Sequence, residues 1–436
     1  MKTLLERAKG SPLDVFIDFR DSASTLSLLS PRIRQISYLT FVCVRWEDVQ
    51  RFSQVNFGLF PLLHALEIDI TAIFIPEAPP TTPSALPLFG NVAHLKQFVL
   101  HTVGSPFLNH FVFPNITTFE LSTSPVEKEF HASELLNFLE ASPMLQTVDV
   151  KIASRILLED VAQTKVVVLP NVQTFFLIVD DGGPGYELAS HMSCPSASYT
   201  SLVQRVDAED MIPDQDVFPA AALWNTIVSQ YTKSPAEVIT LEIKHSIDPT
   251  VVCALAFQSS DTSFISLGLE VFGVTADTIT QGVFLEVFSQ AVKAIRNHPL
   301  LPNVKRLHIE NTIPISELEE LTRMVSKVGS LFKSVGPLDE LTLSRCDLDP
   351  YLTAFLDLLG LGYVGQPITF PPIKELTVLH PPMGSKECLI AIAELAKSQH
   401  ALGVPFERVT IHALWLPKTM AEMLDPWVGE VDCYVL

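Results

Sequence analysis

Cysteine is scarce in this sequence, and its spacing excludes two common uses. No two cysteines form a Cys-x-x-Cys pair, so the sequence indicates neither a zinc site nor a dense disulfide framework. The pattern favours buried thiols in a reducing compartment, with no bound metal. The six cysteines are Cys43, Cys194, Cys253, Cys346, Cys388 and Cys433.

Long apolar runs are also missing. No stretch approaches the ~20 apolar residues that a membrane-spanning helix needs, and residues 1–10 lack the apolar segment of a signal peptide. We therefore expect a cytoplasmic or nuclear protein with no membrane partner.

Positive charge is in short supply. The chain has 29 lysines and arginines against 49 aspartates and glutamates, for a formal net charge of -20. A protein that binds nucleic acid needs a concentrated basic surface to contact phosphates. The sequence therefore predicts no nucleic-acid partner, and we interpret the acidic surplus as a solvated surface.

Catalytic motifs are absent as well, since the sequence contains neither HExxH nor GxSxG. The glycine-rich stretch 180–186 lacks the Lys-Ser/Thr pair of a phosphate-binding loop, and its two aspartates would repel an anion. A connecting turn is favoured there over a ligand loop. We predict a non-enzymatic protein with no catalytic residue and no cofactor; an enzyme with a site built on such loops is the alternative.

A recurring phrase organises the chain. In its clearest copies, at 113–121, 169–177 and 301–309, an apolar-Pro-Asn turn precedes apolar residues at the first, fourth and sixth positions. A spacing of about 20–50 residues between copies is typical of stacked repeats. The first apolar residue of each copy, here called the anchor, is Ile33, Leu63, Leu95, Ile116, Leu145, Val172, Val238, Phe264, Val304, Leu338, Ile373 or Phe406, and a degenerate copy occupies 197–202.

Between the anchors, apolar residues recur at helical spacing. Strand followed by helix, repeated, predicts an α/β fold: a leucine-rich-repeat-like solenoid of about 12–13 irregular repeats, a horseshoe or arc with parallel strands inside and helices outside. We interpret residues 1–436 as a single solenoid domain, with a helix/strand cap at 1–20 and a surface loop at 204–233. The predicted helices are 134–141, 284–295, 318–331, 351–359 and 385–399.

The strand positions that face away from the core form a polar ladder. With apolar residues at positions one, four and six, positions three and five lie on the opposite face of each strand. Threonine and carboxylates recur there, which is typical of a solvated sheet face and equally of a concave recognition surface. The candidate protein-binding residues of this face are Glu67, Glu120, Asp149, Glu242, Arg306, His308, Glu340, Glu375 and Arg408.

The repeat phrases, together with Ser-Pro-Leu-Asp-Val-Phe-Ile-Asp at 11–18 and Phe-Leu-Glu-Ala-Ser-Pro at 138–143, resemble the F-box/leucine-rich-repeat-like proteins of mushroom-forming (basidiomycete) fungi. The resemblance covers nearly the whole chain. It implies an N-terminal F-box that binds a Skp-type adaptor of a cullin ubiquitin ligase, while the repeats present the substrate. Here only ten residues precede Ser11, and no Leu-Pro-x-Glu opening occurs.

Two functions follow from this reading. The leading hypothesis is a non-enzymatic protein–protein recognition module, the substrate-binding repeat region of an F-box-type ubiquitin-ligase receptor. The alternative is a free-standing scaffold or decoy that binds protein targets without recruiting a ligase. Both predict an unknown protein target, and only the first predicts binding to a Skp-type adaptor.

Overall fold

A computed structural model describes the chain in segments that fall into two compact units, residues 1–204 and 205–436. Each unit is a mixed α/β structure built mainly on parallel strands. The described residues are 11–18, 30–42, 60–70, 92, 94–102, 108, 111–124, 129–159, 161–162, 165–180, 184–207, 221–231, 238–247, 251–259, 264–272, 301–311, 332, 334–344, 372–379, 386–413 and 420–435.

The first unit is a ladder in which every described pairing between successive strands is parallel. Successive strands are also neighbours in space, as stacked repeats require. In spatial order the strands are β1 (Leu13–Asp18), β2 (Ile36–Val42), β3 (Ala65–Asp69), β4 (Gln97–Thr102), β5 (Thr118–Thr123), β7 (Thr147–Ile152), β10 (Thr174–Val179) and β12 (Tyr199–Asp207).

Each repeat phrase begins with a turn that closes on its anchor. In the copy at 113–121 the amide of Ile116 donates to the carbonyl of Phe113 at 3.4 Å. Pro114 occupies the second position of this four-residue turn, where its fixed φ is favourable, and Asn115 occupies the third. Equivalent bonds end at Leu63, Leu95, Leu145, Val172, Ala197 and Val304.

The residue after each anchor joins one repeat to the one before. The amide of Thr117 donates to the carbonyl of Lys96 at 2.7 Å, and that of Gln146 donates to the carbonyl of Thr117 at 2.7 Å. Gln173 continues the series by donating to the carbonyl of Gln146 at 2.8 Å. Because the same bond recurs at the same place in each repeat, the strands start in register.

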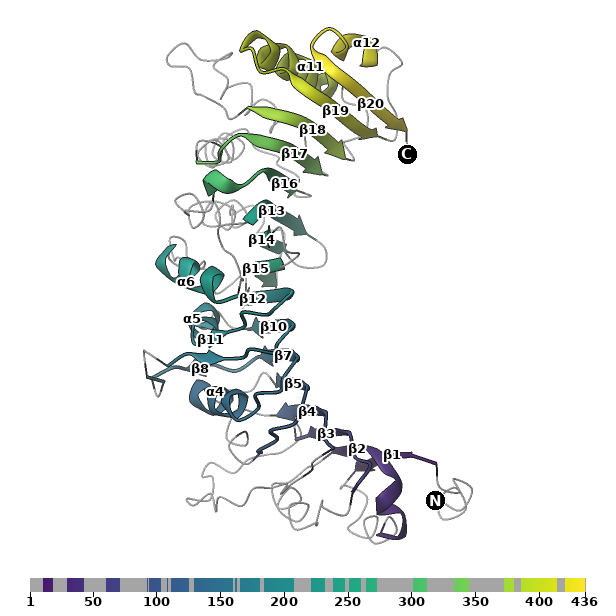
Figure 1. The fold of residues 1–436 in the computed structure, drawn as a ribbon, viewed down its shortest axis with the longest axis vertical. Helices are drawn as coiled ribbons and strands as arrows, with labels where there is room; N and C mark the ends of the chain where they lie inside the picture. Colours follow the sequence, from purple (N-terminus) through teal and green to yellow (C-terminus); the bar gives the residue numbers. More distant parts are fainter. Residues whose placement is uncertain are drawn as a thin grey trace. The chain divides into compact units, whose positions relative to one another are not determined.

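Helices cover the buried side of the strands in the first unit. Helix α4 (Ala132–Glu140) begins two residues before the predicted 134–141 and ends one residue before its end, and it buries Leu135, Leu136, Phe138 and Leu139. Helix α5 (Gly185–Ser190) contacts β10. Both helices lie on the same side of the ladder (Figure 1). Short parallel pairs, β6 (Phe130–His131) with β8 (Ile156–Leu157) and β9 (Val167–Val168) with β11 (Met192–Ser193), and the 3-10 helix η1 (Ser30–Gln35) complete its described elements.

Five phenylalanine rings form the densest part of this core. Phe98 is fully buried and lies between Phe113 and Phe111, with ring centroids 4.9 and 5.0 Å away. Phe119 and Phe138 pack at 6.0 and 5.9 Å from the same ring. A strand, a turn and a helix are therefore joined through one side chain at the fourth position of its repeat.

The second unit is also mostly parallel, but it contains one reversed strand. In spatial order its strands are β15 (Phe264–Phe272), β14 (Val251–Ser259), β13 (Val238–Ile247), β16 (Arg306–Asn311), β17 (Leu338–Ser344), β18 (Ile373–Leu379), β19 (Phe406–Ala413) and β20 (Val428–Val435).

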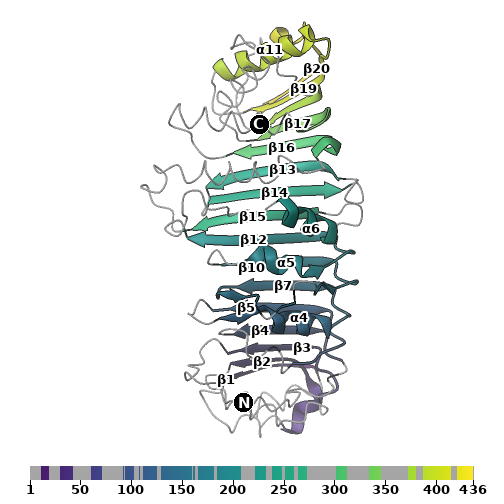
Figure 2. The ribbon, with the colours of Figure 1, turned by 90° about the vertical axis from the view of Figure 1, so that its left-hand side faces the viewer.

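The reversed strand corrects the prediction of uniformly parallel strands. Strand β14 pairs antiparallel with both β13 and β15, and Figure 2 shows its arrow opposed to theirs. Residues 248–250 are the only link from β13 to β14, which is too short for a parallel crossover of a dozen or more residues. The anchor Phe264 therefore belongs to the third strand of a meander.

The predicted surface loop at 204–233 is wrong at both of its ends. Strand β12 continues to Asp207, and α6 spans Ala221–Tyr231. Leu223, Ile227, Val228 and Tyr231 recur at helical spacing, and the last three are buried. This apolar stripe explains why the segment is a helix.

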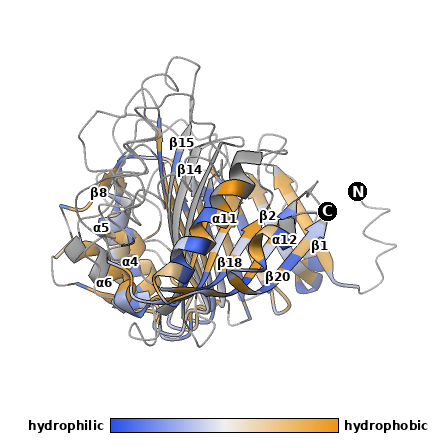
Figure 3. Cartoon of the chain, turned by 90° about the horizontal axis from the view of Figure 1, so that it is seen from above, coloured by the Kyte–Doolittle hydropathy of each residue, from blue (hydrophilic) through white to orange (hydrophobic). Residues whose placement is uncertain are grey.

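Two further helices belong to the second unit, α11 (Lys386–Ala401) and α12 (Met420–Leu424), besides the short η5 (Leu301–Asn303). Helix α11 confirms the predicted 385–399, contacts β19 and α12, and carries both apolar and polar residues along its length (Figure 3). No helix in the described part of the chain is long and apolar enough to cross a membrane. The predicted helices at 284–295, 318–331 and 351–359 lie outside the described residues.

One anchor was misplaced. Ile33 lies in η1 and is half-exposed, whereas Ile36 is 1% exposed and begins β2. The register pairs Tyr38 with Ala65, which is the third position of the next repeat. The first repeat therefore starts three residues later than its sequence suggested, with Leu39 and Phe41 as its buried fourth and sixth residues.

Candidate functional site

The side chains that point away from the core of the first unit are aligned in rows across the strands, and this side of the ladder is here called the polar face. Its middle row takes one residue from each strand at the fifth repeat position, so the row is defined by the strand pairings. From β1 to β12 it consists of Phe16, Thr40, Glu67, Val99, Glu120, Asp149, Phe176 and Ser201. Three of the candidate residues, Glu67, Glu120 and Asp149, thus share one row, as the sequence predicted.

Glu67 is the best-connected carboxylate of this row. Tyr38 donates its hydroxyl to Oε2 of Glu67 at 2.7 Å, and Thr40 donates to the same oxygen at 3.1 Å. Nε2 of His101 lies 3.6 Å from Oε1. These contacts from β2 and β4 fix the orientation of a carboxylate whose side chain is 26% exposed.

A hydroxyl, an imidazole and a carboxylate follow one another across three strands. Oγ of Ser122 lies 2.8 Å from Nδ1 of His101, whose other ring nitrogen faces Glu67. The same order of groups activates the nucleophile in serine hydrolases. However, Ser122 lies inside a ladder paired on both sides, and no pair of free amides is described beside it to hold an oxyanion. We interpret the three groups as a hydrogen-bonding surface.

The pKa of Tyr38 leads to a testable prediction about stability. Burial, the hydrogen bond to Glu67 and the charge of Glu67 raise the pKa of Tyr38 from 10.0 to about 12. The pKa in the folded state exceeds the unfolded value, so the contribution of neutral Tyr38 is complete below pH 10 and is lost as the pH rises from 10 to about 12. The free energy of unfolding of the wild type, measured relative to that of Tyr38→Phe, should therefore fall as the pH rises from 10 to about 12. Urea unfolding at a series of pH values tests this, with pH 7 as baseline; parallel pH curves would contradict it.

Asp149 carries charge that its neighbours balance only in part. Its Oδ2 lies 3.4 Å from Nζ of Lys151, an exposed contact. Its Oδ1 is buried and has no hydrogen-bond partner among the described residues. Glu120, on the neighbouring strand, faces Gln97 at 3.5 Å, the outer limit of a hydrogen bond.

An apolar area, here called the aromatic patch, adjoins Asp149. It consists of Phe176 and Ile178 on β10 and Tyr199 and Val203 on β12. The rings of Phe176 and Tyr199 are 5.2 Å apart, and Tyr199 is 38% exposed. Phe176 pairs in register with Asp149, so the polar face changes from acidic to apolar within one strand spacing.

The equivalent face of the second unit carries both arginine and glutamate side chains. Its third-position row runs Thr240, Arg306, Glu340, Glu375, Arg408 and Glu430, in strand order from β13 to β20. Arg408 donates from Nε and Nη2 to Oε2 of Glu430 at 2.9 and 2.6 Å, and this partner raises the pKa of Arg408. His308 pairs in register with Glu242, whose side chain is outside the described atoms. The predicted mixed character of the face around Arg306 and Arg408 stays a prediction.

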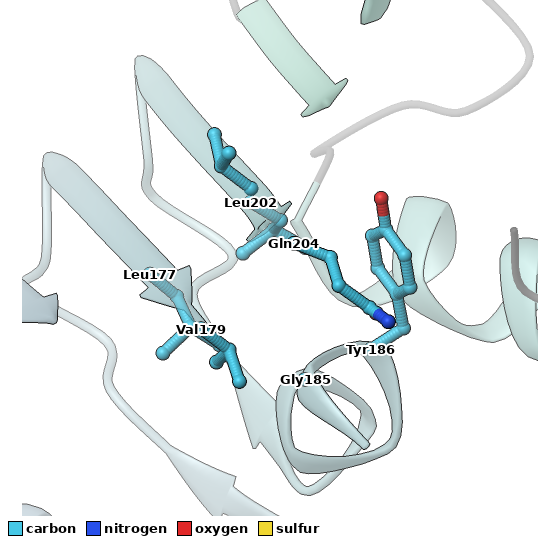
Figure 4. A pocket seen from close by; sticks show the side chains of 7 residues that line it. Leu177, Val179, Gly185, Tyr186, Leu202 and Gln204 are labelled. Atoms are coloured by element: carbon cyan, nitrogen blue, oxygen red, sulfur yellow. The ribbon is translucent and has the colours of Figure 1, made fainter. Parts of the chain in front are cut away.

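The glycine-rich stretch leads into a small hollow on the buried side of the first unit. Leu177, Val179, Tyr186, Leu202 and other residues line it (Figure 4). The hollow is too narrow to hold a water molecule. Helix α5 begins at Gly185, and a Cβ there would lie 3.0 Å from the side chain of Val179. The glycine thus permits close packing of helix on strand.

Metal ligands and reactive thiols do not gather in the described segments. No group of three or more His, Cys, Asp or Glu side chains there could hold a metal ion. Cys194 is buried, as predicted, and burial raises the pKa of its thiol. Cys433 is exposed, against the prediction, because β20 has a neighbouring strand on one side only.

The sequence missed several residues of the polar face. His101, Ser122 and Lys151 occupy the seventh repeat position, which strict alternation along the strands would have included. Tyr38 was hidden by the misplaced first anchor, and Tyr199 by the degenerate repeat at 197–202.

Comparison with known proteins adds no family to this description. No protein-family model matches the chain, and no curated protein matches it significantly.

Proposed function

We propose that this chain is a non-enzymatic protein-recognition module and that the polar face of its first unit is the recognition surface. The observation that carries the proposal is the register: seven consecutive strands after β1 place acidic, hydroxyl, imidazole and aromatic groups in aligned rows on one open face. The helices described in that unit occupy the opposite side. A fixed array of partly exposed groups suits a protein partner better than a small molecule, which needs a concave pocket.

We further propose that both ladders belong to a leucine-rich-repeat-like solenoid with about 12–13 irregular repeats. The recurring turn, the bond from each repeat to the previous one and the parallel strands support it. In this proposal the repeats present a substrate in an F-box-type ubiquitin-ligase receptor. A scaffold or decoy without ligase recruitment is the second candidate.

Charge reversal on the polar face tests recognition. The whole chain serves as bait in an extract, and the proteins it retains are compared with those retained by Glu120→Lys/Asp149→Lys. Reversed charges repel a partner that is complementary to this face, so we expect specific partners to fall at least tenfold. The matched control is Glu159→Lys/Glu187→Lys, which reverses two exposed carboxylates away from the polar face.

The same two variants also show which results would contradict the proposal. Loss of the same partners from both the face variant and the control, or retention by both, would contradict recognition through the polar face. Binding of the purified chain to a Skp-type adaptor, with an F-box protein as positive control, then separates the receptor from the scaffold.

A further inference from the structure

The middle row of the polar face combines two kinds of surface that together specify a partner. Glu67, Glu120 and Asp149 supply carboxylates, and the aromatic patch begins on the strand next to Asp149. Aromatic side chains are typical anchors of protein interfaces. Carboxylates beside such an anchor select the charge of what binds.

The negative charge of this row is left largely unbalanced by its own surroundings. Of the three carboxylates, Asp149 has an exposed lysine at 3.4 Å, and Glu67 has the imidazole of His101 at 3.6 Å. Glu120 is contacted by the uncharged amide of Gln97. The second unit differs, since a guanidinium bonds directly to Glu430 there.

We infer that the polar face of the first unit binds a basic segment of a protein partner, with an apolar side chain on the aromatic patch and lysine or arginine side chains along Asp149, Glu120 and Glu67. This inference rests on the proposed function and names the chemistry of the partner. Strands β3 to β10 are separated by four strand spacings of about 4.8 Å, or roughly 19 Å. An extended segment of about six residues covers that distance at about 3.3 Å per residue.

The unused acceptor at Asp149 lies at the junction of the two surfaces. Among the described residues, Oδ1 is buried without a hydrogen-bond partner while Oδ2 faces Lys151. Rotation of the carboxylate toward an incoming guanidinium would give both oxygens a donor, in the bidentate geometry that arginine favours. An arginine of a basic partner would therefore form charge-assisted, bidentate hydrogen bonds with this carboxylate.

A labelled peptide tests the inference with the whole chain in solution. The probe has two leucines at one end and lysine or arginine at alternate positions over about six further residues, and its acidic analogue carries glutamate instead. Fluorescence anisotropy should show at least tenfold tighter binding of the basic probe. Raising the salt from about 50 to about 500 mM should weaken it severalfold, because exposed charges are screened.

Substitutions then separate the two surfaces. Glu120→Gln/Asp149→Asn should weaken the basic probe about tenfold, and Tyr199→Ala should weaken it severalfold without changing the charge preference. Glu187→Gln, on the helix side, is the control and should change nothing. Equal binding of basic and acidic probes would overturn the inference, as would indifference to both substitutions. Spermine, a small polycation, is added as a competitor to test whether charge attraction alone explains the binding of the probe. If spermine displaces the probe fully and Tyr199→Ala has no effect, the inference is wrong.

The peptide experiment and the bait experiment test the two proposals separately. Partners captured through the polar face with no charge preference among peptides would leave the proposed function standing and remove this inference. A basic probe that binds as described, while the bait retains no partner through that face, would remove the proposed function instead.

Discussion

Phe98→Ala should cost about 3–5 kcal/mol of the free energy of unfolding, the largest effect we expect from a single truncation in this chain. The ring is fully buried and packs against Phe111, Phe113, Phe119 and Phe138, with centroids between 4.9 and 6.0 Å away. Its removal leaves a cavity that four other rings line. Because those rings come from turn, strand and helix, the site cannot collapse around one flexible segment.

Denaturant unfolding followed by circular dichroism measures this loss, and hydrogen exchange locates it. Protection should fall first in residues 94–102 and 111–124, which carry four of the five rings. Phe16→Ala is the matched control, because Phe16 is 62% exposed on a strand of the same unit; it should change stability by less than about 0.5 kcal/mol. Equal losses in the two variants would show that the cluster is not packed as described.

The same cluster shows why much of the fold could be predicted from the sequence. Anchors such as Ile116 and Val172 recur with buried fourth and sixth residues, and a two-residue period fixes which side chains face the core. A turn with proline at its second position precedes most of the anchors whose turn is described. These patterns are local, so they can be recognised within one repeat without knowledge of the neighbouring repeats.

Features that depend on neighbouring strands were harder to find. The contact between Tyr38 and Glu67 requires the register of β2 on β3, and a three-residue error in the first anchor conceals it. The meander of β13 to β15 was read as two stacked repeats, because β14 has the same apolar character as a parallel strand. The three-residue link at 248–250 was the available signal.

The recognition surface was predicted in outline for a similar reason. Positions three and five of each repeat gave Glu67, Glu120 and Asp149 their common row, since identical repeat phrases imply identical register. The aromatic patch was not predicted. Tyr199 belongs to a repeat whose anchor is alanine and whose fourth residue is threonine, so apolar periodicity gave little weight to that strand.

The threonine of that degenerate repeat leads to the second prediction, that Thr200→Val stabilises the chain by about 1–3 kcal/mol. Thr200 is 0% exposed, and its Oγ1 has no hydrogen-bond partner among the described residues. It pairs in register with Phe175, and the fourth position carries an apolar residue in the preceding repeats of the unit. Valine has almost the same shape and retains the preference for a strand, while it removes the cost of a buried, unsatisfied hydroxyl.

Urea midpoints of wild type, Thr200→Val and Thr118→Val test this second prediction. Thr118 is the control because it occupies a half-exposed third position on the polar face, where water solvates the hydroxyl in both states and its loss should matter little. A higher midpoint for Thr200→Val alone would mean that the degenerate repeat packs as a full member of the ladder, weakened by one oxygen atom. A lower midpoint would instead show that Oγ1 has a buried acceptor, and the seventh and eighth strands of the unit would then be joined by a polar contact that the other repeats lack.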